Sequence, residues 1–200
     1  MYNYFQNSID HIMAEINRIE LKLHLKMISL KQNDGHINKD IFEGLYISEK
    51  EAEAITGTGK YQTNDESSQI QEPDTVRISD ALKQLDKEIY SKKKESLRRG
   101  ISLRLATLER LFQLNSFDID TLLVCLLPEI DLKYQRLYAY LQNDVTQKNP
   151  TVNLTLELLC KSFPEMLKSR NAFSSDAPLI KFQLVHLHEN HTSTPTPLLA

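Results

Sequence analysis

Apolar residues recur at steps of three and four along most of this chain, which is the period of an amphipathic helix. The longest such stripe predicts one helix over residues 3–31, about 45 Å long at 1.5 Å per residue. A lone amphipathic helix is marginal in water, so the stripe needs a partner surface, and other helices of the same chain are the expected one. The stripe consists of Ile9, Ile12, Ile16, Ile19, Leu23, Met27 and Leu30, widened by Met13, Leu21 and Leu25. An intermolecular coiled coil is the alternative, although Lys26 would then enter its seam.

A change in composition divides the chain after this first part. Ser48 and Glu51 have the spacing of a capping box, which predicts a short helix that begins at Ser48 and ends near Gly57. Residues 57–77 are polar, lack a period and contain Pro73, so they are predicted to be a flexible linker. We therefore expect an N-terminal helical segment over residues 1–56, this linker, and a further domain over residues 78–200.

The further domain begins with helical patterns and ends with a change of period. Helices are predicted from Ser79 to Gly100, over 101–114, from a cap at Ser116 to a stop at Pro128, over 129–142, over 151–160 and over 163–173. Their inward residues are expected to be Leu82, Leu85, Ile89, Leu105, Leu108, Leu111, Phe112, Leu132, Leu137, Tyr138, Leu141, Val152, Leu156 and Leu159.

Residues 180–187 alternate imperfectly and are predicted to form a strand, with Leu198 and Leu199 opening a second strand. Three helices followed by a two-stranded hairpin are the pattern of a winged helix. The predicted fold class is mainly α, with a helical N-terminal part and a winged-helix-like half that ends in a short β-hairpin.

Charge and cysteine content narrow the possible functions. The 200 residues include 24 basic and 27 acidic ones, a formal charge of −3, which gives no overall field that favours nucleic acid. Cys125 and Cys160 lie in apolar helical patterns and are expected to be buried free thiols. The N-terminus lacks the pattern of an export signal and no apolar run reaches 18 residues, so a cytoplasmic protein is expected.

The segment Gly57-Thr58-Gly59-Lys60 resembles the end of a phosphate-binding loop but lacks its other parts. The loop pattern G-x-x-x-x-G-K-[ST] places a glycine where Ala54 stands and a serine or threonine where Tyr61 stands. The preceding residues are also predicted to be helical, whereas the loop follows a strand. The segment is better interpreted as a helix end that leads into the linker, and no nucleotide is expected to bind there.

Two further groups of polar residues can be interpreted as a catalytic or metal site, or more simply as helix-end charges and surface residues. Glu129 and Asp131 would suit glycosidase-like acid and base chemistry, but favourable charges at a helix start explain them more simply. His186, His188 and His191 form the pattern H-x-H-x-x-H. On a strand, His186 and His188 would share a face and could bind a metal ion, although exposed histidines are the simpler interpretation. No catalytic constellation is found, so no catalytic residue, cofactor or metal is predicted and the chain is not expected to be an enzyme.

One basic cluster stands out, made of Lys92, Lys93, Lys94, Arg98, Arg99 and Arg104. Such a cluster can contact an anion or nucleic acid. It can also be the solvated C-terminal end of a helix, where cations are favoured by the helix dipole. Glu88 and Glu95 interrupt the cluster, which favours the solvated helix end.

Residues 108–160 contain the segment "LYAYLQNDVT" followed by "PTV", and this stretch resembles the winged-helix region that precedes the ATPase module in a family of bacterial AAA ATPases. The segments "DHIMAEINRIELKLHLK" at 10–26 and "GLYIS" at 44–48 are similar to the same family's N-terminus, whereas residues 57–77 are unmatched. The family's phosphate loop lies downstream of its winged helix, so none of its nucleotide-binding residues carries over. The resemblance implies an accessory N-terminal region, an excised fragment of a larger ATPase that contacts a partner or substrate or positions the ATPase ring. Some members of the family are encoded with contractile injection systems.

The helix predicted over 151–160 is the one that would read DNA in a winged helix. Its polar side carries Thr151, Asn153, Thr155 and Glu157 and no cation. Members of the family are more basic before this helix, where Lys148 here is the one charge, and this difference disfavours DNA reading. The residues expected to contact a partner or nucleic acid are Lys92, Lys93, Lys94, Arg98, Arg99, Lys148, Thr151 and Asn153.

Three functions are therefore considered, in order of preference. The first is a protein-interaction domain of an AAA ATPase, with a protein or the ATPase module of the same chain as its partner. The second is a DNA-binding winged helix that uses the cations from Lys92 to Arg104 together with Lys148. The third is a scaffold that self-associates through the helix over 3–31.

Overall fold

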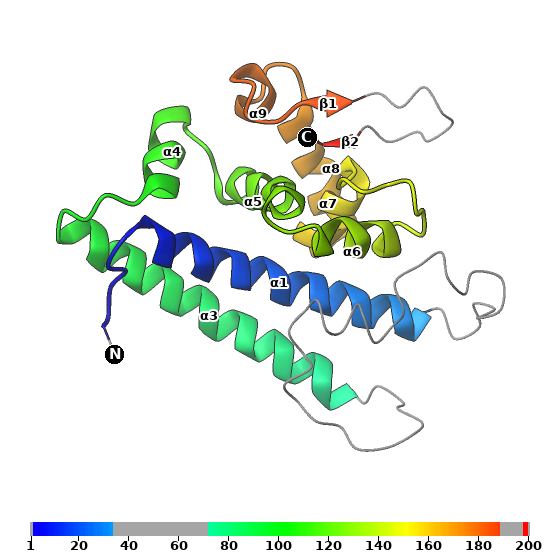
Figure 1. Ribbon diagram of the computed structural model, residues 1–200, viewed down its shortest axis with the longest axis horizontal. Coiled ribbons are helices and arrows are strands. Elements are labelled where there is room, and N and C mark those ends of the chain that lie inside the picture. The colour runs from blue at the N-terminus through cyan, green and yellow to red at the C-terminus, as the bar shows by residue number, and fades with distance from the viewer. Residues whose placement is uncertain (1, 34–71, 189–197, 200) are drawn as a thin grey trace.

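The protein is a mainly helical body in which one long helix lies between a second long helix and a group of shorter elements. The computed structural model describes residues 2–33, 72–188 and 198–199. The long helix α1 (Ser8–Asn33) runs beside the equally long α3 (Glu72–Arg98) on one side and faces α5, α6 and α7 on the other (Figure 1). The other elements are α4 (Arg104–Phe112), α5 (Ser116–Ile130), α6 (Lys133–Leu141), α7 (Val152–Leu159), α8 (Phe163–Ser169), η2 (Arg170–Phe173), α9 (Pro178–Lys181), β1 (Leu187–His188) and β2 (Leu198–Leu199).

The apolar stripe of α1 forms the centre of the main core, as its spacing predicts. Ile16, Ile19, Leu23 and Met27 are buried against residues of α5, α6 and α7. Ile9 and Met13 were expected to face inward too, but they are 70% and 58% exposed. The first turns of α1 lie beyond the end of α5 (Figure 1), so nothing among the described helices covers these two side chains fully.

Helix α3 begins earlier than predicted. Residues 72–77 were assigned to the linker because of Pro73, yet they form the first turns of this helix. Proline is tolerated in a first turn, where its missing N–H has no helical partner to lose. The helix ends where Gly100 adopts a φ of 77°, as its position predicts. The short helix predicted over 48–57 and the segment 57–71 lie outside the described residues.

A small second core joins the ends of α1 and α3. Phe5, Ile89 and Leu103 are buried together, and the Phe5 N–H donates to Ser96 Oγ at 2.7 Å. Because α1 also packs against α5, α6 and α7, the first and last of the predicted parts lie in direct contact.

Helix α5 starts and ends differently from the sequence prediction. Its cap is Asn115, whose side chain accepts from Asp118 N–H while the Asp118 carboxylate accepts from Asn115 N–H; Ser116 is already the first helical residue. Pro128 was expected to stop the helix but lies inside it, and the helix continues to Ile130.

A tyrosine explains how α5 passes through its proline. A proline at position 128 cannot donate to the carbonyl four residues earlier, which belongs to Val124. The buried Tyr138 hydroxyl of α6 donates to that oxygen at 2.7 Å instead. Burial raises the pKa of Tyr138 well above its usual value, so this hydroxyl stays protonated and remains a donor.

The segment after Pro178 corrects the predicted strand. Residues 178–181 form the short helix α9, with Pro178 in its first turn and Leu179 fully buried, so the predicted strand over 180–187 is wrong apart from its last residue. A short apolar run of this kind fits a strand or a buried helical turn equally well. The hairpin itself is confirmed: β1 pairs antiparallel with β2, with Leu187 opposite Leu199 and His188 opposite Leu198.

Several inward residues are confirmed and two are wrong. Leu137, Tyr138 and Leu141 of α6 are buried, but the adjacent Leu132 is 68% exposed and Leu111 of α4 is exposed as well. Leu132 directly precedes α6, and Leu111 lies in the last turn of α4. Within the described parts of the chain, no helix has the length and apolarity needed to span a membrane.

We predict that Tyr138→Phe costs about 1–3 kcal/mol of stability, because it leaves the buried Val124 carbonyl without a donor. In a Pro128→Ala background the cost should fall below about 1 kcal/mol, because alanine at this position supplies the backbone N–H that proline lacks. Urea unfolding of the four proteins measures this coupling. Tyr90→Phe, at an exposed position, is the matched control. If Tyr138→Phe lowers stability equally with Pro128 in place and in the Pro128→Ala background, the Tyr138 hydroxyl does not replace the missing backbone N–H of Pro128.

Candidate functional site

One side chain shapes the connection between α6 and α7. The Gln142 amide nitrogen lies 3.1, 3.1 and 3.0 Å from the carbonyl oxygens of Tyr138, Gln147 and Asn149. Its Oε1 accepts from Thr151 N–H at 3.0 Å, so the same side chain reaches the start of α7. The connection that carries Lys148 is therefore fixed from within.

Helix α7 is the helix that corresponds by position to a recognition helix, and most of its sides are covered. Thr151, which was predicted to lead this helix, is its cap and accepts from Leu154 N–H. Thr151 and Thr155 were placed on the polar side, but both are buried, and Thr155 donates to the Thr151 carbonyl. Such back-bonding satisfies a threonine hydroxyl inside a core. The helix packs against α1, α5, α8 and η2.

The exposed positions of α7 are Asn153 and Glu157, and both are already engaged. The Asn153 amide donates to Glu157 Oε1 at 2.7 Å, and Lys26 of α1 pairs with Glu157 Oε2 at 2.5 Å. The face that a DNA-reading helix would turn to the major groove thus carries an amide and a carboxylate, with a contact to α1 across it.

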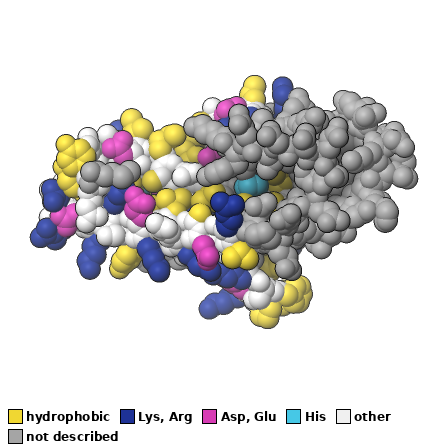
Figure 2. All heavy atoms as spheres, turned by 90° about the horizontal axis from the view of Figure 1, so that it is seen from below, with side chains coloured by type: hydrophobic (Ala, Val, Ile, Leu, Met, Phe, Trp, Pro, Cys, Tyr) yellow, Lys and Arg dark blue, Asp and Glu magenta, His cyan; other side chains and the backbone are white. Residues whose placement is uncertain are grey.

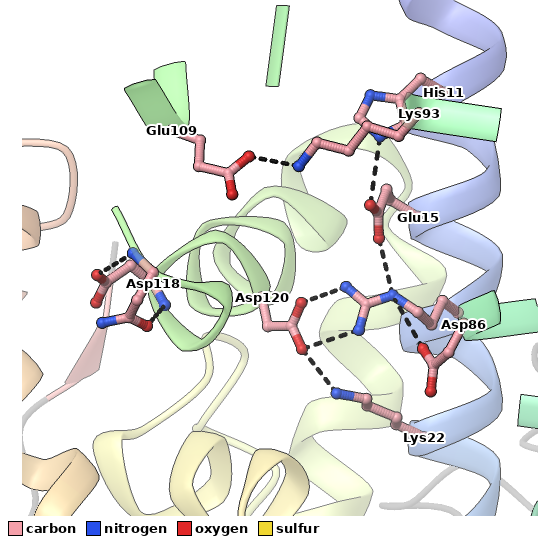
Figure 3. A network of polar contacts seen from close by, with 10 residues as sticks. His11, Glu15, Lys22, Asp86, Lys93, Glu109, Asp118 and Asp120 are labelled. Atoms are coloured by element: carbon pink, nitrogen blue, oxygen red, sulfur yellow. Dashed lines mark hydrogen bonds and ion pairs between the residues drawn. The ribbon is translucent and has the colours of Figure 1, made fainter. Parts of the chain in front are cut away.

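A charge network fixes α1 to α5 (Figure 3). Asp120, near the start of α5, accepts from both terminal nitrogens of Arg18 and from Lys22 at 2.7 Å. Glu15 accepts from Arg18 Nε at 2.8 Å and lies 3.3 Å from His11 Nε2, and Asp86 of α3 lies 3.8 Å from the same Arg18 nitrogen. We call Glu15, Arg18, Lys22 and Asp120 the α1–α5 charge network.

Burial and charge act in opposite directions in this network. Burial disfavours the charged form of Arg18, but the hydrogen bonds and charge of Asp120 outweigh it and raise the pKa of Arg18. Burial likewise acts to raise the pKa of Glu15, but His11 and Arg18 outweigh it and leave the pKa lowered. The charged forms of Arg18 and Glu15 are therefore the favoured ones. Sequence analysis missed this network, although an aspartate inside the apolar run "FDIDTLLVCLL" was a signal for it.

The basic cluster at the end of α3 is matched by carboxylates. Lys92 pairs with Glu88 at 2.5 Å and Lys93 pairs with Glu109 of α4. Arg98 and Arg99 both donate to Glu95 and lower its pKa to about 2. Figure 2 shows the molecule from below Figure 1, with acidic side chains lying among the basic ones.

Two aromatic residues from before α1 join this end of α3. Arg99 lies over the Tyr4 ring, 4.2 Å from its centre, and Lys92 lies 5.8 Å from the centre of the Phe5 ring. Lys94 and Arg104 are exposed. The end of α3 and the α6–α7 connection lie at opposite ends of the molecule (Figure 1), so the structure does not bring the α3 cations together with Lys148, Thr151 and Asn153.

The remaining candidate groups show no shared site. His186 and His188 are exposed, while His191 and the glycine segment 57–60 lie outside the described residues. Asp131 ends α5 and accepts from Lys133 N–H, and Glu129 is exposed. No group of metal-ligating side chains occurs among the residues that the structure describes. Cys125 and Cys160 are free and partly buried, and burial raises the pKa of Cys125 to about 12.

Comparison with known proteins gives the family. A family model described as "Winged helix domain, variant" matches residues 2–200. The chain belongs to this winged-helix family. No curated protein and no solved structure matches it. The matched residues include α1 and α3. The family model therefore extends beyond α5, α6, α7 and the hairpin.

We predict that Asp120→Asn lowers the free energy of unfolding by about 2–4 kcal/mol. Removing one partner of a fully buried ion pair costs roughly 3–5 kcal/mol, and Arg18, Lys22 and Asp120 retain a little solvent contact. Asp86→Asn is the matched control, because that side chain is half exposed, lies farther from Arg18 and should change stability by under about 0.5 kcal/mol. Thermal or urea unfolding at neutral pH measures both. Similar effects of the two substitutions would refute the special role of Asp120.

Proposed function

We propose that this winged-helix domain is a non-catalytic module that contacts another protein. The observation that carries the proposal is the burial of α7 beneath α1, with Asn153 and Glu157 as its exposed positions. A helix-turn-helix reads DNA by placing its second helix in the major groove. Here that helix is largely part of the core, and the fold alone does not fix a function.

The electrostatics support protein contact over DNA contact. Duplex binding draws much of its affinity from neutralised phosphates. Glu157 places a carboxylate on the exposed side of α7, and the cations at the end of α3 are mostly paired with carboxylates of the same chain. Lys148 is the one cation in the α6–α7 connection. These features leave little free positive charge where a winged helix would meet the DNA backbone.

The finer role that we propose is that of an accessory N-terminal region of a cytoplasmic AAA ATPase. The resemblance of residues 108–160, with the segment "LYAYLQNDVT" and the following "PTV", supports it. In the structure this stretch spans the turn that Gln142 organises and the cap that Thr151 provides. The partner would be another protein or the ATPase module of the same chain, and the domain itself needs no cofactor for this role.

We predict that residues 1–200 show no saturable binding to a labelled DNA duplex at about 50 mM salt, a condition that favours phosphate contacts. Fluorescence anisotropy measures this, and Lys148→Glu should leave the titration unchanged. Lys94→Glu, at an exposed cation of α3, is the matched control. Saturable binding that falls steeply with salt and is lost in Lys148→Glu would instead establish the DNA-binding alternative.

We predict that the gene encodes, beyond codon 200, a strand followed by G-x-x-x-x-G-K-[ST]. The complete protein should then bind ATP in calorimetry, whereas residues 1–200 should not. Chemical crosslinking of the complete protein should connect residues 1–200 to a second protein or to the ATPase module. A reading frame that ends without a phosphate loop, or ATP binding by residues 1–200, would refute the AAA placement.

A further inference from the structure

Helix α8 and the turn η2 that continues it carry an exposed stripe. Phe163 and Leu167 are 69% and 57% exposed, and Arg170 is exposed as well. Their spacing of four and three places them on one face. Met166 and Phe173, in the same two elements, pack against the main core. These two side chains hold α8 and η2 to the core, while the stripe itself is exposed to solvent. We call Phe163, Leu167 and Arg170 the α8 stripe.

The charge around the α8 stripe is unbalanced, in contrast to the end of α3. Residues 161–170 include three cations, Lys161, Lys168 and Arg170, against the single carboxylate of Glu165, a charge of +2 on a chain of formal charge −3. Glu165 accepts from the backbone N–H of Lys161 at 2.8 Å. Among the described residues, none of the three cations has a carboxylate within ion-pair distance, whereas Lys92, Lys93, Arg98 and Arg99 each have one.

We propose that the α8 stripe docks an acidic segment of a partner protein. Apolar side chains of that segment would cover Phe163 and Leu167, and its carboxylates would face Lys161, Lys168 and Arg170. Large apolar side chains surrounded by charged ones are the usual composition of a protein-binding patch. This inference rests on the proposed function and names its surface and the chemistry of the partner.

The same features disfavour other occupants of the stripe. A second copy of the chain, related by a two-fold axis, would bring equal patches of charge +2 together, which costs binding energy. Nucleic acid would leave Phe163 and Leu167 against a phosphate backbone, which offers no apolar surface to cover them. An acidic protein segment satisfies the apolar side chains and the cations together.

The test uses a fluorescein-labelled amphipathic peptide of leucine and glutamate, about 14 residues or four helical turns long. Residues 1–200 should bind it saturably in fluorescence anisotropy. The peptide with lysine in place of glutamate should not bind. We expect the double substitution Phe163→Ser with Leu167→Ser, and separately Arg170→Glu, to raise the Kd at least tenfold. Leu132→Ser and Lys94→Glu, at an exposed apolar residue and an exposed cation elsewhere, are the matched controls and should leave the Kd unchanged.

Several results would overturn the assignment. Binding that is unchanged in both α8 variants, or no saturable binding of the acidic peptide, would refute it. A different occupant of the stripe would also refute it. In that case the acidic peptide does not bind, and the α8 variants abolish self-association in sedimentation, binding to phosphatidylserine vesicles or binding to duplex DNA. Circular dichroism melting checks that the variants fold. If the variant with both serine substitutions does not fold, Arg170→Glu alone tests the proposal. Crosslinks to a partner that persist in the α8 variants would leave the proposed function standing and remove only its assignment to α8.

Discussion

The burial of one face of α1 is the constraint on which the rest of the structure depends. Ile19 and Leu23 lose all contact with water and Met27 nearly all, and each such side chain contributes on the order of 1.5–3 kcal/mol. Helices α5, α6 and α7 provide the apolar surface that covers them. Because α1 occupies this position, α7 turns its own apolar face toward it, and α1 shares one core with the winged-helix portion, while α3 contributes to the small second core.

Apolar burial has no direction, so something else must set how α1 lies across α5. The α1–α5 charge network can do this, because the planar fork of Arg18 meets the two oxygens of Asp120 in a defined geometry. Tyr138 of α6 plays a related part, because it donates to the Val124 carbonyl of α5 that Pro128 leaves without a helical donor. Both contacts are polar, buried and specific, and each joins α5 to a different neighbour.

Sequence patterns predicted the local features well and the long-range ones poorly. The stripe of α1, the stop at Gly100, the helix that Thr151 leads and the second strand at Leu198 each depend on neighbouring residues. Pro128 was misread because its compensation comes from a hydroxyl ten residues later, and no local pattern reveals that. Among the candidate contacts, the cations of α3 were identified. Their pairs with Glu88 and Glu95 are local to the helix, but the contacts of Lys93 with Glu109 of α4 and of Arg99 with Tyr4 are tertiary and no local pattern reveals them.

Ion pairs within α3 and between helices decide what kind of surface the domain presents. Most of the cations at the end of α3, which in the sequence suggested contact with nucleic acid, form ion pairs with carboxylates of the same helix or of α4. The exposed side of α7 holds the Glu157 carboxylate, which pairs with Lys26. Free positive charge beside exposed apolar side chains remains at α8, which lies on the far side of α7 from α1 (Figure 1). The exposed face of α7 thus carries Asn153 and the Glu157–Lys26 pair, and α8 is a further surface that the core leaves open.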